Sequence, residues 1–145
     1  METVNKIMTK KVVTCTPSTS IMDAAKKMRS KTISSVVVVN GKKPVGIVTE
    51  RDFTKKVVSL NLDTKKNPVS KIMTSPVISI PPETNIYYAQ EQMEKKNFRR
   101  FPVTNKKGEL IGIITQRDIL NYLTEQRKKF VLHSLSKNLR KKYPV

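Results

Sequence analysis

The 145-residue sequence has little of several residue types, and each shortage excludes a kind of site. A single cysteine, Cys15, excludes internal disulfides and cysteine-based metal clusters. It lies in an alternating apolar segment, so we expect a small buried residue. The one histidine, His133, has no carboxylate partner near it in the sequence, and neither a Gly-rich phosphate loop nor a His/Cys/Asp cluster with metal-ligand spacing is present. Because no catalytic constellation remains, we expect a protein that is not an enzyme.

Long apolar runs are also missing. No stretch approaches the roughly 20 apolar residues that a helix needs to cross a bilayer. The segment Met1 to Thr9 lacks the apolar core of a signal peptide, so we expect a cytoplasmic protein without a membrane span. Tryptophan is absent and glycine occurs four times, but 37% of the residues are apolar, which suits an α/β protein with a buried core.

Acidic residues are scarce. The chain has 11 Asp and Glu against 29 Lys and Arg, which gives a net charge of +18. Residues 125–145 are the most basic part, with seven basic residues and one acidic residue. Such a surface attracts nucleotides, nucleic acid and anionic membranes alike, so charge alone does not select a partner.

One unit occurs twice. Gly46 to Asp52 reads Gly-Ile-Val-Thr-Glu-Arg-Asp, and Gly112 to Asp118 reads Gly-Ile-Ile-Thr-Gln-Arg-Asp. The run Lys-Ile-Met-Thr stands at 6–9 and again at 71–74. A unit of this size that is present twice predicts two similar halves packed face to face rather than a solenoid.

Each half is predicted to have the order β-α-β-β-α, which makes the fold class α/β (α+β). In the first half the expected elements are a strand at 12–15, a helix capped by Ser20, strands at 36–39 and 45–48, and a helix from 50 to about 60. In the second half they are a strand at 77–80, a helix with Ile86, Ala89 and Met93, strands from 101 and at 110–114, and a helix with Ile119, Leu120 and Leu123. The predicted domains are 1–60 and 69–124, joined by a linker at 61–68 and followed by a basic helical tail at 125–145.

The tail repeats apolar residues at helical spacing: Phe130, Val131, Leu132, Leu135 and Leu139. Two interpretations are open. The tail packs on the body or on a second subunit, or it lies as a basic amphipathic helix on nucleic acid or a membrane.

The threonine and aspartate of the doubled motif also have two interpretations. The pattern predicts a buried strand, a tight turn and a helix N-terminus, which is a favourable place for phosphate. The aspartate could then accept hydrogen bonds from two neighbouring hydroxyls, as on a ribose. Thr49-x-x-Asp52 and Thr115-x-x-Asp118 equally fit a capping box, in which both side chains satisfy the first backbone N–H groups of the helix.

Together, the K-I-M-T run, the short strand that ends at a proline, the helix, the strand and the G-h-h-T-x-R-D motif resemble the CBS domain, named after cystathionine β-synthase. Two in tandem resemble a CBS pair, or Bateman module, over about Val4 to Leu123. The resemblance implies two CBS repeats packed with pseudo-two-fold symmetry, and disc-shaped homodimers. It implies no required cofactor, but clefts that commonly hold AMP, ADP or ATP, or S-adenosylmethionine in some members.

The resemblance also implies which residues form the clefts. The motif aspartate would hold the ribose hydroxyls and the motif threonine would face the phosphate or sugar, while the other half surrounds the adenine. One cleft would use Thr49, Arg51, Asp52, Val77, Ile78, Phe98, Arg99 and Arg100. The other would use Thr115, Arg117, Asp118, Val12, Val13, Ile33, Ser34 and Ser35.

Two differences between the repeats predict that the clefts are unequal. Arg99 and Arg100 precede a buried strand, so one of the two guanidinium groups is expected to face the cleft and bind phosphate. The equivalent positions in the first half are uncharged serines, so we expect the Asp52 cleft to suit a phosphorylated ligand better. Pro102 stands where the first half has Val37, and we expect it to alter the strand beside the Asp118 cleft.

The leading hypothesis is an adenine-nucleotide sensor that signals to a separate, unknown protein partner. The alternative is a nucleic-acid-binding protein that uses its basic surface and tail. It is weakened because the four Phe and four Tyr are not interleaved with the basic residues. A third hypothesis, a purely structural dimerisation unit, does not explain why both Thr-x-Arg-Asp sets are present.

Overall fold

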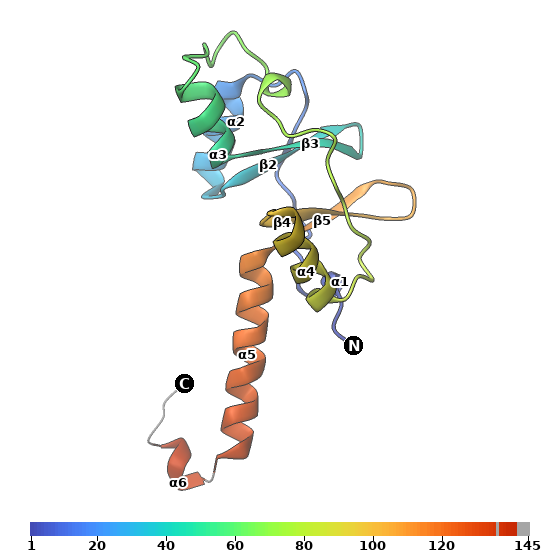
Figure 1. The fold of residues 1–145 in the computed structure, drawn as a ribbon, viewed down its shortest axis with the longest axis vertical. Helices are drawn as coiled ribbons and strands as arrows, with labels where there is room; N and C mark the ends of the chain where they lie inside the picture. The colour runs from blue at the N-terminus through green and yellow to red at the C-terminus, as the bar shows by residue number, and fades with distance from the viewer. Residues whose placement is uncertain (136, 142–145) are drawn as a thin grey trace.

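The computed structural model describes residues 1–135 and 137–141, which form two α/β halves and a long helix that projects from the second half (Figure 1). In chain order the elements are α1 (Val4–Ile7), β1 (Thr14–Cys15), α2 (Ile21–Lys31), β2 (Ser35–Asn40), β3 (Lys43–Thr49), α3 (Glu50–Asp52), the π-helix η1 (Phe53–Val58), the 3-10 helix η2 (Val69–Lys71), α4 (Ile86–Lys96), β4 (Arg100–Thr104), β5 (Leu110–Thr115), α5 (Gln116–Ser134) and α6 (Lys137–Arg140).

The sheet of the first half has the order β1-β2-β3, with β1 parallel and β3 antiparallel to β2. Val36, Val37 and Val38 are fully buried, as expected for a strand covered on both faces. Side chains alternate along a strand, so Val36 and Val38 enter the core of the first half, whereas Val37 lines one of the clefts. Helix α2 begins where predicted, with Ser20 Oγ accepting a hydrogen bond from the Asp23 N–H (3.0 Å).

The predicted strand at 77–80 is wrong. Among the described residues, β5 is the only strand that pairs with β4 in the second half. The 77–80 segment adds a single parallel bridge to β4, from Ile80 to Val103. In the first half the Val37 N–H donates to Val13 O (3.2 Å), but the equivalent Pro102 has no N–H to donate. Pro102 therefore shortens this pairing, and it does so in the segment beside the Asp52 cleft rather than beside the Asp118 cleft.

The segment before each half packs on the other half. Val4 and Met8 belong to the core of the second half, whereas Val69 and Ile72 belong to the core of the first half. Figure 1 shows the consequence: α1, at the N-terminus, lies beside α4 of the second half.

We call this arrangement the exchange of segments, because the segment that precedes each half packs on the other half. Backbone hydrogen bonds fix it. Thr9 and Ile113 donate to each other's carbonyls (2.9 Å both ways), and Thr74 and Ile47 do the same (2.9 and 3.2 Å). Both Lys-Ile-Met-Thr runs thus pair with the glycine-containing strand of the opposite half.

The methionine of each run packs against a glycine. A Cβ placed on Gly112 would lie 2.5 Å from Met8 Sδ, and one placed on Gly46 would lie 2.5 Å from Met73 Sδ. The doubled glycine is therefore explained by close approach of a side chain rather than by backbone conformation.

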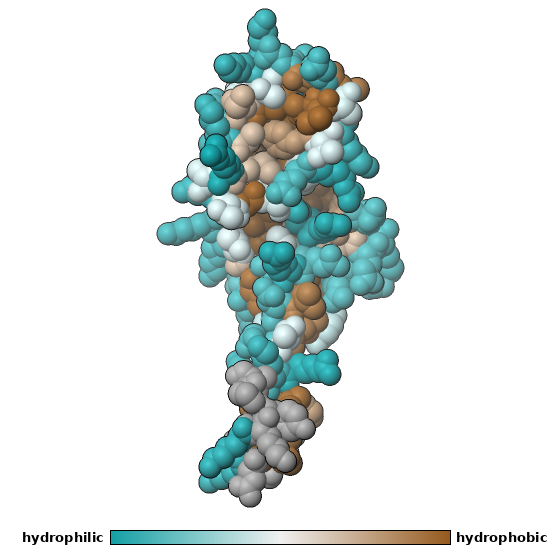
Figure 2. Space-filling view, turned by 90° about the vertical axis from the view of Figure 1, so that its left-hand side faces the viewer, coloured by the Kyte–Doolittle hydropathy of each residue, from teal (hydrophilic) through white to brown (hydrophobic). Residues whose placement is uncertain are grey.

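Helix α5 runs without a break across Thr124, so the tail continues the last helix of the second half as far as Ser134. Phe130 is 73% exposed on it. Among residues 1–135 and 137–141, no helix is both long and apolar enough to span a bilayer. Hydrophilic side chains cover most of the face seen in Figure 2, and apolar surface shows mainly at the end formed by the first half.

Candidate functional site

Two clefts lie between the halves, one at each copy of the doubled motif. The Asp52 cleft has a volume of about 270 Å3. It brings together all eight residues assigned to it from the sequence: Thr49, Arg51, Asp52, Val77, Ile78, Phe98, Arg99 and Arg100. The other residues that line it are Ser34, Ile47, Glu50, Thr74, Pro76, Asn97 and Pro102.

The Asp118 cleft is larger, about 1250 Å3, and more open to solvent. It likewise brings together its eight assigned residues: Val12, Val13, Ile33, Ser34, Ser35, Thr115, Arg117 and Asp118. Further polar lining residues are Thr9, Lys11, Arg29, Thr32, Glu50, Thr54, Arg99, Arg100 and Gln116. The structure thus gathers each predicted set around one cleft, and the part of these residues in binding stays a prediction.

Both motif aspartates form the capping box. The Thr49 N–H (2.8 Å) and Oγ1 (3.2 Å) donate to Asp52 Oδ2, and the Thr115 N–H (2.8 Å) and Oγ1 (2.7 Å) donate to Asp118 Oδ2. Each box engages only one of the two carboxylate oxygens, and each oxygen has two lone pairs. Capping and ligand binding, the two interpretations left open by the sequence, are therefore compatible.

The two aspartates differ in the partners of Oδ1, the carboxylate oxygen that the capping box does not use. Asp52 is buried, and its Oδ1 pairs with Lys56 Nζ at 2.9 Å. Lys56 Nζ also donates to Ile72 O (2.8 Å), in the exchanged segment that packs on the first half. The position of the second half that corresponds to Lys56 is Tyr122, and within the described part of the chain no donor bonds to Asp118 Oδ1.

Arg100 lies between the clefts and lines both of them. Its Nη1 donates to Ser34 Oγ (3.2 Å), which also lines both. Burial lowers the pKa of Arg100 from its ordinary value, the Glu50 carboxylate acts in the opposite direction, and Arg99 adds to the lowering. A guanidinium stays protonated in proteins all the same, so Arg100 offers its charge to either cleft.

The reason given for favouring the Asp52 cleft as a phosphate site is therefore wrong. Arg99 and Arg100 do not distinguish the clefts, because both residues line both clefts. Among the described residues, the cations at the Asp52 cleft are Arg51, Arg99 and Arg100, whereas those at the Asp118 cleft are Lys11, Arg29, Arg99, Arg100 and Arg117. The charge inequality runs in the opposite direction to the prediction.

Among the hydroxyl groups that the sequence reasoning missed, one recurs at equivalent positions in the two clefts. Thr9 lines the Asp118 cleft and Thr74 lines the Asp52 cleft, because the exchanged segments carry them there. The sequence did contain a signal for these two threonines, because each is the last residue of a Lys-Ile-Met-Thr run and that run occurs twice.

The Asp52 cleft also has an apolar wall, which includes Val77, Ile78 and Phe98. Phe98 is held edge-on to Phe101 with ring centroids 6.1 Å apart, a favourable aromatic geometry that fixes the ring at the cleft. Over residues 1–135 and 137–141, no group of three or more His, Cys, Asp or Glu residues could hold a metal ion.

Comparison with known proteins gives matches over most of the chain. The CBS-domain family model matches residues 4–59 and 69–125. The uncharacterized protein MK0525 of Methanopyrus kandleri is 38% identical over 135 residues, which are 88% of this chain and 69% of that protein. The crystal structure of the CBS domain protein NE2398 is 28% identical, with a TM-score of 0.80 over 86% of this chain and 99% of that one.

A third match was solved with ligands. The CBS domain pair of protein MJ0100, in complex with 5′-methylthioadenosine and S-adenosyl-L-methionine, is 28% identical, with a TM-score of 0.79 over 87% of this chain and 98% of that one. These matches confirm the two tandem repeats and the mixed α/β architecture expected from the sequence.

Proposed function

We propose a function that starts from the family, since the chain belongs to the CBS-domain family. It is a regulatory module that binds an adenosine-containing ligand between its repeats and signals to a separate partner that the ligand is bound. Each cleft combines a motif aspartate that can accept further hydrogen bonds with a neighbouring threonine and several arginines. This combination supports the proposal most strongly, because it matches a ribose joined to an anionic group.

We propose AMP, ADP or ATP as the ligand class. The related MJ0100 pair was solved with two adenosine-containing molecules, which supports the adenosine part. The cations at both clefts favour ligands that carry phosphate, since guanidinium groups bind phosphate through directed, charge-assisted hydrogen bonds. S-adenosylmethionine carries a sulfonium in place of phosphate, so the same cations favour it less.

The signal would come from the two halves. Residues from both halves line each cleft, so a bound ligand contacts both and favours the arrangement in which its contacts are best. We propose that a homodimer of such modules presents this change to a protein partner and that the chain itself is not catalytic.

The test is a thermal-shift and calorimetric screen with AMP, ADP, ATP, 5′-methylthioadenosine and S-adenosylmethionine. A ligand at a hundred times its Kd stabilises the folded state by about 2.7 kcal/mol. For a chain of this length that raises Tm by roughly 5–10 °C. The double variant Asp52→Ala/Asp118→Ala should lose the shift while still folding.

The matched control is Ser20→Ala. Ser20 also caps a helix, with its own Oγ accepting from the Asp23 N–H, but it lines neither cleft. Ser20→Ala should therefore cost about 1 kcal/mol of stability and leave ligand affinity alone. Absence of a shift with all five compounds, or unchanged affinity in the double aspartate variant, would overturn the proposed function.

A further inference from the structure

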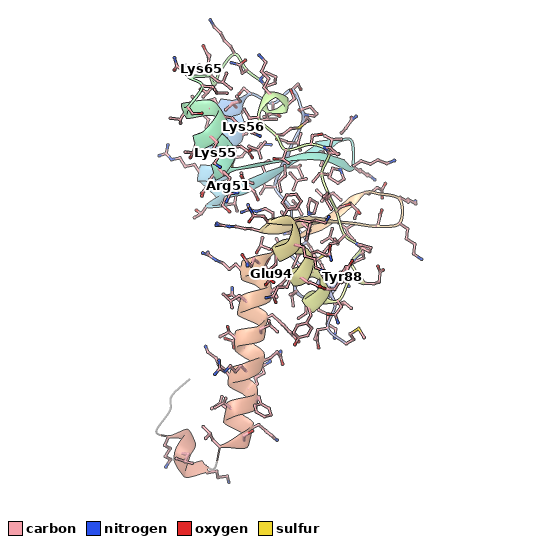
Figure 3. All side chains as sticks on the ribbon, viewed as in Figure 1. Arg51, Lys55, Lys56, Lys65, Tyr88 and Glu94 are labelled. Carbon is pink, nitrogen blue, oxygen red and sulfur yellow. The ribbon has the colours of Figure 1, made fainter. Side chains whose placement is uncertain are left out.

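We infer that the Asp118 cleft is the primary nucleoside site of this chain and that Lys56 keeps the Asp52 cleft in a state of lower affinity. The inference rests on the proposed function and deepens it, because it assigns unequal tasks to two clefts whose motifs look alike. Arg51, Lys55 and Lys56 project from one helical segment of the first half (Figure 3).

The first argument concerns hydrogen-bond acceptors. A carboxylate has about four lone-pair positions, and the 2′,3′-diol of a ribose offers two hydroxyl donors. Asp52 already accepts from the Thr49 N–H (2.8 Å), Thr49 Oγ1 (3.2 Å) and Lys56 Nζ (2.9 Å). About one position remains, too few for both hydroxyls unless Lys56 leaves.

Asp118 has the capacity that Asp52 lacks. It accepts from the Thr115 N–H (2.8 Å) and Thr115 Oγ1 (2.7 Å), both at Oδ2. In the described residues no protein donor occupies its Oδ1, and Tyr122 stands where the first half has Lys56. Asp118 can therefore accept both hydroxyls of a ribose without losing any contact.

Lys56 is held in place by more than its charge. Its Nζ bonds to Asp52 Oδ1 and to Ile72 O (2.8 Å), so it links the motif helix to the exchanged segment. The Asp52 side chain is 9% exposed and that of Lys56 is 40% exposed, so the ion pair is shielded from solvent on the carboxylate side only. Separating such a pair leaves a buried charge without its partner, which is costly.

The second argument, independent of the first, concerns volume and charge. Small-ligand sites are usually about 300–1,000 Å3. The Asp52 cleft, at about 270 Å3, lies just below this range and the Asp118 cleft, at about 1250 Å3, lies above it, so the Asp118 cleft offers a ligand more room. The Asp118 cleft also has Lys11, Arg29 and Arg117 in addition to the two arginines that both clefts share.

The ranking is tested by calorimetry with AMP on the full chain, with Asp52→Ala, Asp118→Ala and the wild type compared at one salt concentration. We expect Asp118→Ala to weaken the tighter binding event by at least about tenfold, and by more than Asp52→Ala does. A larger loss in Asp52→Ala than in Asp118→Ala would overturn the ranking while leaving the proposed function standing. If the wild-type chain binds another of the five compounds more tightly than AMP, the same ranking is measured with that compound. Failure to bind any of the five would overturn both the ranking and the proposed function.

The part of Lys56 is tested in the Asp118→Ala background, where only the Asp52 cleft keeps its aspartate. Lys56→Met should raise AMP affinity about tenfold, because it frees Asp52 Oδ1. Lys55→Met, a neighbour that lines neither cleft, is the matched control and should change nothing.

A melting curve of each variant checks that it folds. If Lys56→Met does not fold, Lys56→Tyr replaces it, because tyrosine is the residue at the equivalent position of the second half. Equal AMP affinity in the Lys56 and Lys55 variants would overturn the inference.

Discussion

Replacement of Gly112 by a larger residue is expected to destabilise the protein while Met8 is in place. A Cβ on Gly112 would lie 2.5 Å from Met8 Sδ and 3.1 Å from its Cγ and Cε, well inside van der Waals contact. Met8 is 9% exposed and belongs to the core of the second half, so it has little room to move aside. Overpacking of this kind usually costs about 1–3 kcal/mol, so we expect Gly112→Ala to lower Tm by roughly 3–9 °C.

A double-mutant cycle separates the clash from other effects. Met8→Ala alone removes a buried side chain and should cost about 2–5 kcal/mol. In the double variant the methyl group introduced by Gly112→Ala enters the space that Met8 leaves, so the combined loss should be at least about 1 kcal/mol smaller than the sum. Urea unfolding followed by circular dichroism supplies the free energies.

A second direct pair and a crossed pair provide the controls. The direct pair, Gly46→Ala with Met73→Ala, should show the same coupling, because a Cβ on Gly46 would lie 2.5 Å from Met73 Sδ. Gly112→Ala with Met73→Ala should be additive to within about 0.5 kcal/mol. Coupling in that crossed pair, together with additivity in the direct pair, would refute the exchange of segments between the halves.

Two further predictions concern charge. Arg100→Ala should weaken ADP and ATP binding more than adenosine binding, because the lost contact is to phosphate; equal loss in calorimetry with all three would assign Arg100 to the fold or the base pocket instead. A chain shortened to end at Thr124 should keep nucleotide binding but lose most affinity for DNA or RNA in band-shift assays, because seven of the basic residues lie at 125–145. That nucleic-acid binding should fall steeply with salt, and sequence-selective, salt-resistant binding by the full chain would instead favour the nucleic-acid hypothesis.

The local sequence pattern was sufficient to predict most of the helices and strands. Four consecutive β-branched residues at 36–39 predicted a strand buried on both faces, and Ser20 marked the start of α2; the structure has both. The strand prediction at 77–80 was wrong because of the neighbouring strand β4 rather than because of the segment itself. Its residues suit a strand, but a strand forms only if the neighbouring chain can complete the hydrogen-bond ladder, and Pro102 cannot.

The exchange of segments could not be predicted from periodicity. The Lys-Ile-Met-Thr runs looked like the start of the half that follows each of them, because a sequence repeat gives the order of elements and not the half on which each one packs. Val4 and Val69 are both fully buried, and their apolar side chains do not indicate which half buries them. Long-range contacts select the exchanged arrangement, among them those of Met8 with Gly112 and of Met73 with Gly46.

The assignment of charge to the clefts failed for a related reason. A position-by-position comparison of the repeats assigns each residue to one cleft. That assignment fails for residues at the boundary between the halves, which can line both clefts. Arg100, Ser34 and Glu50 each line both clefts, and Arg100 bonds to Ser34 across the boundary between the halves. We therefore expect a phosphate bound in either cleft to meet the same guanidinium group. A ligand that drew Arg100 toward one cleft would remove positive charge from the other, so on the proposed function we expect the occupancy of the two clefts to be coupled through this residue.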